Sequence, residues 1–544
     1  MEPDNSDSNE ASPKPVKCSN EASPKPLKSS NEGSPEPGNN DSSEASPEQS
    51  NMDSNEVSPR LGNMDSNEAS PVSYSYQDRN PSPPPSDEGT TVPDSIGSTL
   101  YSKPWLFGTL TKLIEFVERR PVNREEEEEE TSMELDEDLE DDLCKVWDMS
   151  MNEDVALFLK EFGVPDLFVG VINKSRSDRL TEICVGILGN MCCHEETREM
   201  ITENEVLWRM LLLLLSEPDP PTLLETSRLL LTCLSHRDVA NIWLNRIKTQ
   251  TAVKDHICFI MRSSTNADLL LKVGQLVDKL FDMDSKLMIK WVAGPSRHSS
   301  DDEQTPSESN PPVMLFIPSW LEAAKQLRVE GADGLHVYLR TLHLLTIVDG
   351  AYLAIVKTPD GGESIWDFLY DLLMHDLCQP GDPPLMAQRQ KTMLCSVLGV
   401  LSMMFIGRTG QEFLQIHKNL QLIDRTMHVL HHVELHEDSV LEQCKKKRTD
   451  SDSQSLLKED HTIQIFKDIC HEFLADMLNA LKKDNIKACF QEGYLNERKC
   501  CKAIKYIVPN YQSQASGFIK AMSEVDGNLS ETLQKLLPLS SDGP

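Results

Sequence analysis

Four histidines in one short stretch have the spacing that metal chelation requires. His428 and His432 lie four residues apart, as do His432 and His436, and with His431 they can share one face of a helix. Neutral imidazoles at positions i and i+4 can chelate Zn²⁺ or Ni²⁺. No carboxylate or thiol is placed in the sequence so as to complete the ligand set. Ordinary surface or core histidines are therefore the favoured interpretation, and the sequence predicts no metal site and no cofactor.

The common catalytic motifs are missing from the sequence. It contains no Gly-rich phosphate loop, no Gly-x-Ser-x-Gly turn and no His-Glu-x-x-His zinc motif. The segment His432–His436 carries its glutamate one place away from the zincin position, and Cys192–His194 lacks the paired spacing of a zinc module. The sequence predicts that the protein is not an enzyme. A metal- or nucleotide-dependent enzyme with an unfamiliar site is the alternative from another functional class.

The acidity of the chain is concentrated in two segments. The 544 residues include 53 Lys+Arg and 88 Asp+Glu, a formal net charge of −35. Residues 1–92 hold 17 acids and 6 bases, and residues 125–142 hold 13 acids and no base. Binding to nucleic acid needs clustered basic residues that neutralise phosphates, so no direct nucleic-acid partner is expected. The acidic segment is either an attractor for a basic protein or a solvated linker.

The first 92 residues repeat a short polar unit that ends in Ser-Pro. These units contain almost no apolar residues, so they cannot bury enough surface to offset the entropy of ordering, and we expect a long disordered tail. The repeated serines are candidates for proline-directed phosphorylation, with a merely solvating tail as the alternative. The candidate serines are Ser12, Ser23, Ser34, Ser46, Ser58, Ser70 and Ser82.

A short basic run resembles a monopartite nuclear localisation signal. It consists of Lys445, Lys446, Lys447 and Arg448, within a polar stretch expected to be a loop over residues 441–460. An ordinary exposed loop is the alternative. Neither a secretory leader nor a membrane span is expected, since the low-charge run Met393–Gly407 is shorter than the ~20 residues that a spanning helix needs. With 14 sparse cysteines, the chain is expected in the nucleus, with the cytoplasm as a second location.

From residue 143 onward, apolar residues recur every three or four positions, which predicts helices. An offset of 43 residues aligns Ile187, Leu230 and Val273, within the ~40–47 residue period of armadillo and HEAT repeats. The predicted fold class is therefore all-α, an armadillo/HEAT-like α-solenoid behind the tail. The predicted parts after the tail are a capping helix (93–122), an acidic linker (123–142), armadillo-like repeats (143–293), a disordered loop (294–312), helical repeats (313–440), the basic loop (441–460) and C-terminal helices (461–544).

Two kinds of resemblance extend this reading. Residues 163–167 (GVPDL) and 182–190 (EICVGILGN) resemble one complete armadillo repeat. Residues 146–159, 220–235 and 257–261 resemble the serum amyloid A-like family, also called synoviocyte proliferation-associated in collagen-induced arthritis proteins. The resemblance implies a nuclear, armadillo-like protein that promotes proliferation of synovial fibroblasts under inflammatory stimulation, and it implies no catalytic activity. It does not extend to the Ser-Pro tail.

Asn190 is the one candidate for a groove residue. Armadillo importins use an asparagine at this helix position to hydrogen-bond an extended peptide, and they place a tryptophan four residues earlier. Here that earlier position is Gly186, which together with Gly189 is expected to let a neighbouring helix approach closely. The favoured interpretations are an ordinary capping role for Asn190 and a scaffold that binds proteins in a concave groove. A transport adaptor that carries cargo peptides in this groove is the runner-up.

Overall fold

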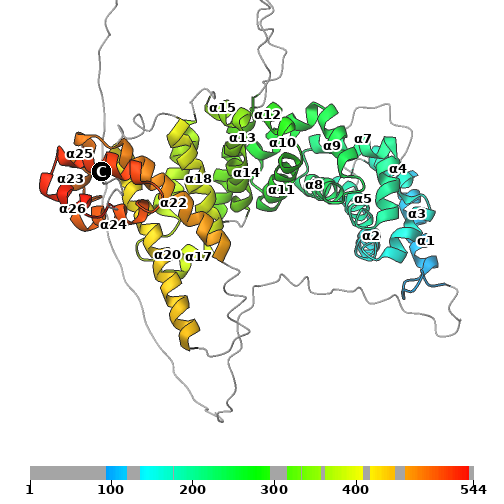
Figure 1. The fold of residues 1–544 in the computed structure, drawn as a ribbon. Coiled ribbons are helices and arrows are strands. Elements are labelled where there is room, and N and C mark those ends of the chain that lie inside the picture. The colour runs from blue at the N-terminus through cyan, green and yellow to red at the C-terminus, as the bar shows by residue number, and fades with distance from the viewer. Residues whose placement is uncertain are drawn as a thin grey trace, which may run out of the picture. The chain divides into compact units, whose positions relative to one another are not determined.

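The computed structural model describes residues 94–118, 135–175, 177–293, 315–331, 334–356, 362–407, 417–446 and 460–537. All of them belong to one unit, Gln77–Pro544. Within these residues the chain is helical without strands, and a single isolated bridge joins Ser95 to Ser102 (Figure 1). The predicted all-α class is confirmed. The Ser-Pro tail and the loop over residues 294–312 lie outside the described residues.

One series of helices forms the backbone of the packing. Each helix of this packed series contacts the next member along the chain, with one or more further helices between them in sequence. Their order follows the colours of Figure 1 from cyan to red. The members are α2 (Glu137–Met149), α5 (Asp178–Met191), α8 (Pro220–Ser235), α11 (Ala267–Met283), α14 (Leu335–Ile347), α18 (Lys391–Gly407), α22 (Asp460–Ala480) and α25 (Gln512–Ser523).

The remaining helices precede, separate or follow the members of the packed series. Two short 3₁₀ turns, η1 (Leu214–Ser216) and η2 (His417–Leu420), accompany them. These helices are α1 (Lys103–Glu118), α3 (Glu153–Glu161), α4 (Val164–Ser175), α6 (Glu195–Glu203), α7 (Glu205–Leu213), α9 (Ala240–Thr249), α10 (Ala252–Ser263), α12 (Ser285–Ala293), α13 (Phe316–Glu330), α15 (Asp349–Val356), α16 (Glu363–His375), α17 (Leu385–Arg389), α20 (Gln421–Lys446), α23 (Lys483–Gln491), α24 (Glu497–Ile507) and α26 (Gly527–Gln534).

Three consecutive helices of the packed series begin at a side-chain cap. The side chains of Ser177, Asp219 and Asn266 accept hydrogen bonds from backbone N–H groups in the first turns of α5, α8 and α11, respectively. Such a cap satisfies one of the N–H groups that a helix leaves unpaired at its start, which stabilises the helix by ~1 kcal/mol. These residues therefore set where each helix begins.

The apolar positions that repeat along the sequence form the core. Ile187, Leu230 and Val273 are completely buried, one in each of α5, α8 and α11. Within each helix, apolar residues recur every three or four positions, so each helix directs one apolar stripe toward its neighbours. The 43-residue offset thus aligns positions that are all in the core.

Two predicted boundaries were wrong. The acidic linker was expected to run to residue 142, but α2 begins at Glu137 and buries Leu139 and Leu143. Its acidic first turn lies at the positive end of the helix dipole, which favours the helix. The basic loop was expected from residue 441, but α20 continues to Lys446.

The low-charge run Met393–Gly407, too short to span a membrane, lies in α18. Its Val397, Leu398 and Leu401 are completely buried. In the described part of the chain, no single helix has the length and apolarity to cross a bilayer, and α14 and α15 reach that threshold only when joined across a 105° bend.

Candidate functional site

Ion pairs and hydrogen bonds connect successive helices of the packed series on their polar sides. Three arginines are central, and each contacts the preceding member of the series. We call this set of side chains the ionic ladder. It comprises Glu140 on α2, Arg179 and Glu182 on α5, Glu225 and Arg228 on α8, Asp278 on α11, and Arg340 on α14.

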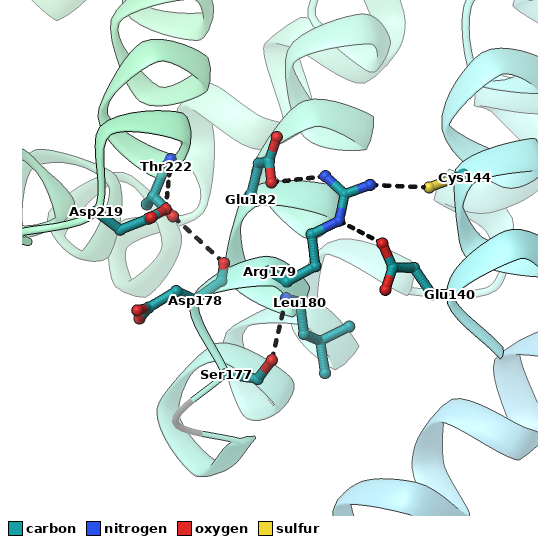
Figure 2. A network of polar contacts seen from close by, with 9 residues as sticks. All are labelled: Glu140, Cys144, Ser177, Asp178, Arg179, Leu180, Glu182, Asp219 and Thr222. Carbon is teal, nitrogen blue, oxygen red and sulfur yellow. Dashed lines mark hydrogen bonds and ion pairs between the residues drawn. The ribbon is translucent and has the colours of Figure 1, made fainter. Parts of the chain in front are cut away.

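The first arginine, Arg179, connects α5 to α2 (Figure 2). Its Nε donates to Glu140 Oε1 at 2.7 Å, and its Nη1 donates to Glu182 Oε2 at 2.6 Å. Its Nη2 donates to Cys144 Sγ at 3.3 Å. Burial raises the pKa of the Cys144 thiol, and the charge of Arg179 opposes this only partly. Cys144 is therefore a hydrogen-bond acceptor at this site and not an activated nucleophile.

The starts of α5 and α8 are joined beside this arginine, as Figure 2 also shows. Ser177 Oγ accepts from the Leu180 N–H, and Asp219 Oδ2 accepts from the Thr222 N–H at 2.9 Å. The Thr222 hydroxyl in turn donates to the Asp178 carbonyl at 3.4 Å. The hydrogen bond from Thr222 to Asp178 therefore joins the first turn of α8 to the first turn of α5, next to the ladder.

The second arginine, Arg228, connects α8 to α5. Its Nε donates to Glu225 Oε2 at 2.6 Å, its Nη1 donates to Asn190 Oδ1 at 3.0 Å, and its Nη2 donates to the Gly186 carbonyl at 3.0 Å. One guanidinium thus satisfies a carboxylate, an amide and a helix carbonyl. A lysine could not make these three directed contacts from one planar group.

Asn190 is used within this contact and does not offer its amide to a peptide. Its Nδ2 donates to the Trp147 carbonyl at 2.8 Å while its Oδ1 accepts from Arg228, and the residue is 5% exposed. Both ends of the amide are therefore occupied by protein groups. The residue is not free in a groove, because its side chain donates to a carbonyl in the last turn of α2 and accepts from Arg228 on α8. It bridges α2, α5 and α8.

Gly186 and Gly189 provide the space for this arrangement. A Cβ atom on Gly186 would clash with Cε2 and Cζ2 of the Trp147 ring, and one on Gly189 would lie 2.9 Å from Arg228 Nη2. The prediction that these glycines allow a neighbouring helix to approach closely is confirmed. The Trp147 ring of α2 packs on Gly186 of α5, and the Arg228 guanidinium of α8 packs on Gly189 of α5.

The third arginine, Arg340, connects α14 to α11. Its Nε donates to Asp278 Oδ1 at 3.1 Å and its Nη2 contacts Asp278 Oδ2, while the Thr341 hydroxyl donates to Asp278 Oδ1 at 3.3 Å. Nearby, Tyr338 donates to the Leu270 carbonyl at 2.8 Å, with its ring seated on Gly274. The same combination of a glycine, an aromatic ring and an arginine thus recurs two steps along the packed series.

The ladder presents its positive charges outward. The side chains of Arg179, Arg228 and Arg340 are 40%, 27% and 62% exposed, whereas those of Glu182, Glu225 and Asp278 are 16%, 12% and 8% exposed. Lys272 on α11 adds a fourth cation whose pKa is lowered by burial and then by the charge of Arg228. Guanidinium groups suit carboxylates on a partner because they bind them with two parallel hydrogen bonds.

Of the predicted nuclear localisation signal, Lys445 and Lys446 are at the C-terminal end of α20. Lys447 and Arg448 lie outside the described residues, as do all seven candidate phosphorylation sites: Ser12, Ser23, Ser34, Ser46, Ser58, Ser70 and Ser82. The predicted signal therefore continues directly from a helix.

Replacing the four basic residues 445–448 with alanine is expected to move the full-length protein from the nucleus to the cytoplasm. Import receptors bind such runs through their positive charges, and alanine removes all four. The measurement is the nuclear-to-cytoplasmic ratio of a fluorescently tagged chain. The matched control replaces Lys482 and Lys483, an exposed basic pair at the start of α23. An unchanged nuclear signal in the 445–448 variant would contradict the prediction.

The described residues define an all-α protein whose successive helices are joined by ion pairs and by side chains seated on glycines. The SAAL1 C-terminal domain family matches residues 253–515. The chain is 47% identical over 469 residues to Protein saal1 of Xenopus tropicalis, covering 86% of this chain and 99% of that protein. It is also 47% identical over 476 residues to Protein SAAL1 of Homo sapiens, covering 85% and 98%. The chain therefore belongs to the SAAL1 family.

Among solved structures, an engineered protein covers 79% of this chain and 98% of its own length, with 13% identity and a TM-score of 0.35. A likeness this low carries no argument about the fold. The armadillo class predicted from the sequence accordingly stays a prediction, while the all-α class and the family are established.

Proposed function

We propose that this chain is a non-enzymatic nuclear scaffold, built as an armadillo-type solenoid, that promotes proliferation of synovial fibroblasts in response to inflammatory stimuli. The proliferative role is supported by the resemblance found in the sequence. The solenoid is supported by the packed series, in which each helix contacts the next member along the chain. Such a series offers a repeated surface on which a partner can bind to several units at once.

The observation that carries the scaffold proposal is the outward charge of the ionic ladder. Its arginines are more exposed than the acids that pair with them, although the chain as a whole has a net charge of −35. Exposed guanidinium groups can bind the carboxylates of a partner that carries a short acidic segment. We therefore propose an acidic protein segment as the occupant of this surface.

The transport adaptor is the weaker proposal. An importin-like groove needs a free asparagine and a tryptophan four residues earlier, but the Asn190 amide is occupied on both sides and the earlier residue is Gly186. The ladder instead offers guanidinium donors, which suit carboxylates and repel the basic peptides that such adaptors carry.

The double variant Arg179→Gln with Arg340→Gln is expected to lose most of the proliferative activity. Glutamine keeps a hydrogen-bond donor but removes the exposed positive charge that would contact acidic partners. The measurement is DNA synthesis in cytokine-treated synovial fibroblasts. The cells are first depleted of their endogenous SAAL1-family protein and then supplied with each variant. Circular dichroism and thermal melting establish that the variant is folded.

The matched control for this experiment is Arg209→Gln on α7. The Arg209 side chain is 62% exposed, as is that of Arg340, and it also pairs with an acid, but it lies outside the ladder. Full rescue by the control together with failure of the folded double variant supports the proposal. Equal rescue by both variants would rule out the ladder as the functional surface.

A further inference from the structure

Three potential metal ligands come together where the segment after α16 meets α20. They are the thiol of Cys378 and the imidazoles of His428 and His432, and one ligand atom from each lies within 4.8 Å of the others. Cys378 is completely buried and His432 is 7% exposed. The two histidines are four residues apart on α20, with ring centroids 4.2 Å apart. This is the spacing that singled out the histidines in the sequence, and the tertiary structure adds the thiol.

The two histidines each have a buried nitrogen without a hydrogen-bond partner. His428 Nε2 and His432 Nδ1 find none among the described residues. A buried polar atom without a partner is destabilising, so each such atom needs a physical explanation. Both nitrogens are therefore available to a metal ion.

The backbone that carries the thiol is held in an unusual conformation. Cys378 has φ +46°, and it alone among the non-glycine residues described here has a positive φ. Its N–H donates to Gln390 Oε1 at 2.7 Å, and its carbonyl accepts from Arg425 Nη1 at 3.2 Å. Strain of this kind persists where surrounding contacts impose it, often at functional sites. The contacts from Gln390 and Arg425 hold Cys378 in place, as hydrogen bonds to the ligating residues do in metal sites.

We propose that Cys378, His428 and His432 bind one Zn²⁺ ion, with a water molecule as the fourth ligand. One thiolate and two imidazoles form a ligand set that Zn²⁺ accepts in tetrahedral geometry. Binding forms the Zn–S bond and releases the thiol proton to solvent, with no change of oxidation state. The ion would join the segment after α16 to α20 and would satisfy both orphan nitrogens.

An access route and a favourable charge accompany the proposed site. A cleft of about 380 Å³ opens beside it, lined in part by Arg425 and His428. The carboxylate of Asp382 accepts from the Gln379 N–H at 2.8 Å, and its negative charge acts on both Cys378 and His432. The positive charge of Arg425 disfavours binding of a cation nearby. Its guanidinium is engaged in hydrogen bonds to the Met374 carbonyl and to Gln379 Oε1.

The test measures metal bound to the full-length chain, purified under reducing conditions without chelators and dialysed with zinc sulfate. Mass spectrometry of the metal content is expected to find one zinc per chain. Cys378→Ser and His432→Gln are each expected to weaken binding by at least ~10- to 100-fold, which is the cost of losing a residue that only hydrogen-bonds to a metal ligand. His431→Gln, the adjacent histidine outside the cluster, and Cys395→Ser, a half-buried thiol on α18, should retain the ion.

Cobalt titration provides a readout that does not depend on any variant. Co²⁺ in this site would show a thiolate-to-cobalt charge-transfer band in the near ultraviolet, together with the intense visible bands of tetrahedral coordination. If Cys378→Ser fails to fold, these bands in the unaltered chain decide the question. Lack of the bands, lack of zinc after dialysis, or zinc retained in full by folded Cys378→Ser would each overturn the proposal.

Discussion

Gly186→Ala is expected to destabilise the chain by ~2 kcal/mol, since overpacking a core contact typically costs 1–3 kcal/mol. Elsewhere in a helix the same exchange is favourable by ~1 kcal/mol because alanine has the higher helix propensity. The sign reverses here because the new methyl group would overlap the Trp147 ring, which belongs to α2 and packs on Gly186 of α5. Urea unfolding followed by circular dichroism measures the change.

Gly170→Ala is the matched control for this prediction. Gly170 lies within α4, and a Cβ atom there would have no neighbour within 4 Å. This variant is expected to be neutral or more stable. In a Trp147→Leu background, the cost of Gly186→Ala should shrink, because the smaller side chain leaves room for the methyl group. A Gly186→Ala chain as stable as the Gly170→Ala chain would show that α2 and α5 do not pack as described.

Arg228→Met is expected to destabilise the chain by about 3 kcal/mol, the cost of leaving a largely buried charge and its neighbours without a partner. Methionine keeps the length of the side chain but removes every donor. The Glu225 carboxylate, the Asn190 amide oxygen and the Gly186 carbonyl would then each lose a hydrogen bond. Glu225 cannot compensate through water alone, since its side chain is 12% exposed.

The control for this second prediction is Arg209→Met on α7. Arg209 pairs with Glu205 four residues earlier, and both side chains are more than 60% exposed. Exposed pairs of this type contribute ~0–1 kcal/mol, so the control should unfold almost as the unaltered chain does. Combining Arg228→Met with Glu225→Gln should cost less than the two separate changes added together, because the second removes the unpaired charge. Full additivity would be inconsistent with a direct Arg228–Glu225 interaction.

The glycine contacts form a pattern along the packed series. Gly399 on α18 lies under His343 of α14, with the nearest ring atom 2.8 Å from the position of a Cβ. In the sequence, residues 397–402 (VLGVLS) echo residues 187–192 (ILGNMC), which contain Gly189. The two similar sequences thus make the same kind of contact, because a polar side chain from a neighbouring helix of the series packs on the glycine in each.

The proposed zinc site illustrates why part of the structure was not predictable from the sequence. The spacing of His428 and His432 was visible in the sequence, since i and i+4 positions always share a helix face. The thiol was not, because Cys378 precedes α17 and α18 and reaches the histidines only when α20 packs beside its segment. The role of Asn190 was missed for a similar reason, as its partners belong to α2 and α8.

By itself, the sequence determined the all-α class and the glycines that permit close approach. These features depend on backbone hydrogen bonds and steric contacts between residues a few positions apart, so a short window of sequence contains their cause. Only the tertiary structure decided which side chains meet: Arg228 with Asn190, Arg340 with Asp278, and Cys378 with two histidines. Those pairings depend on which helices pack together, and that packing results from the burial of apolar surface over the whole unit.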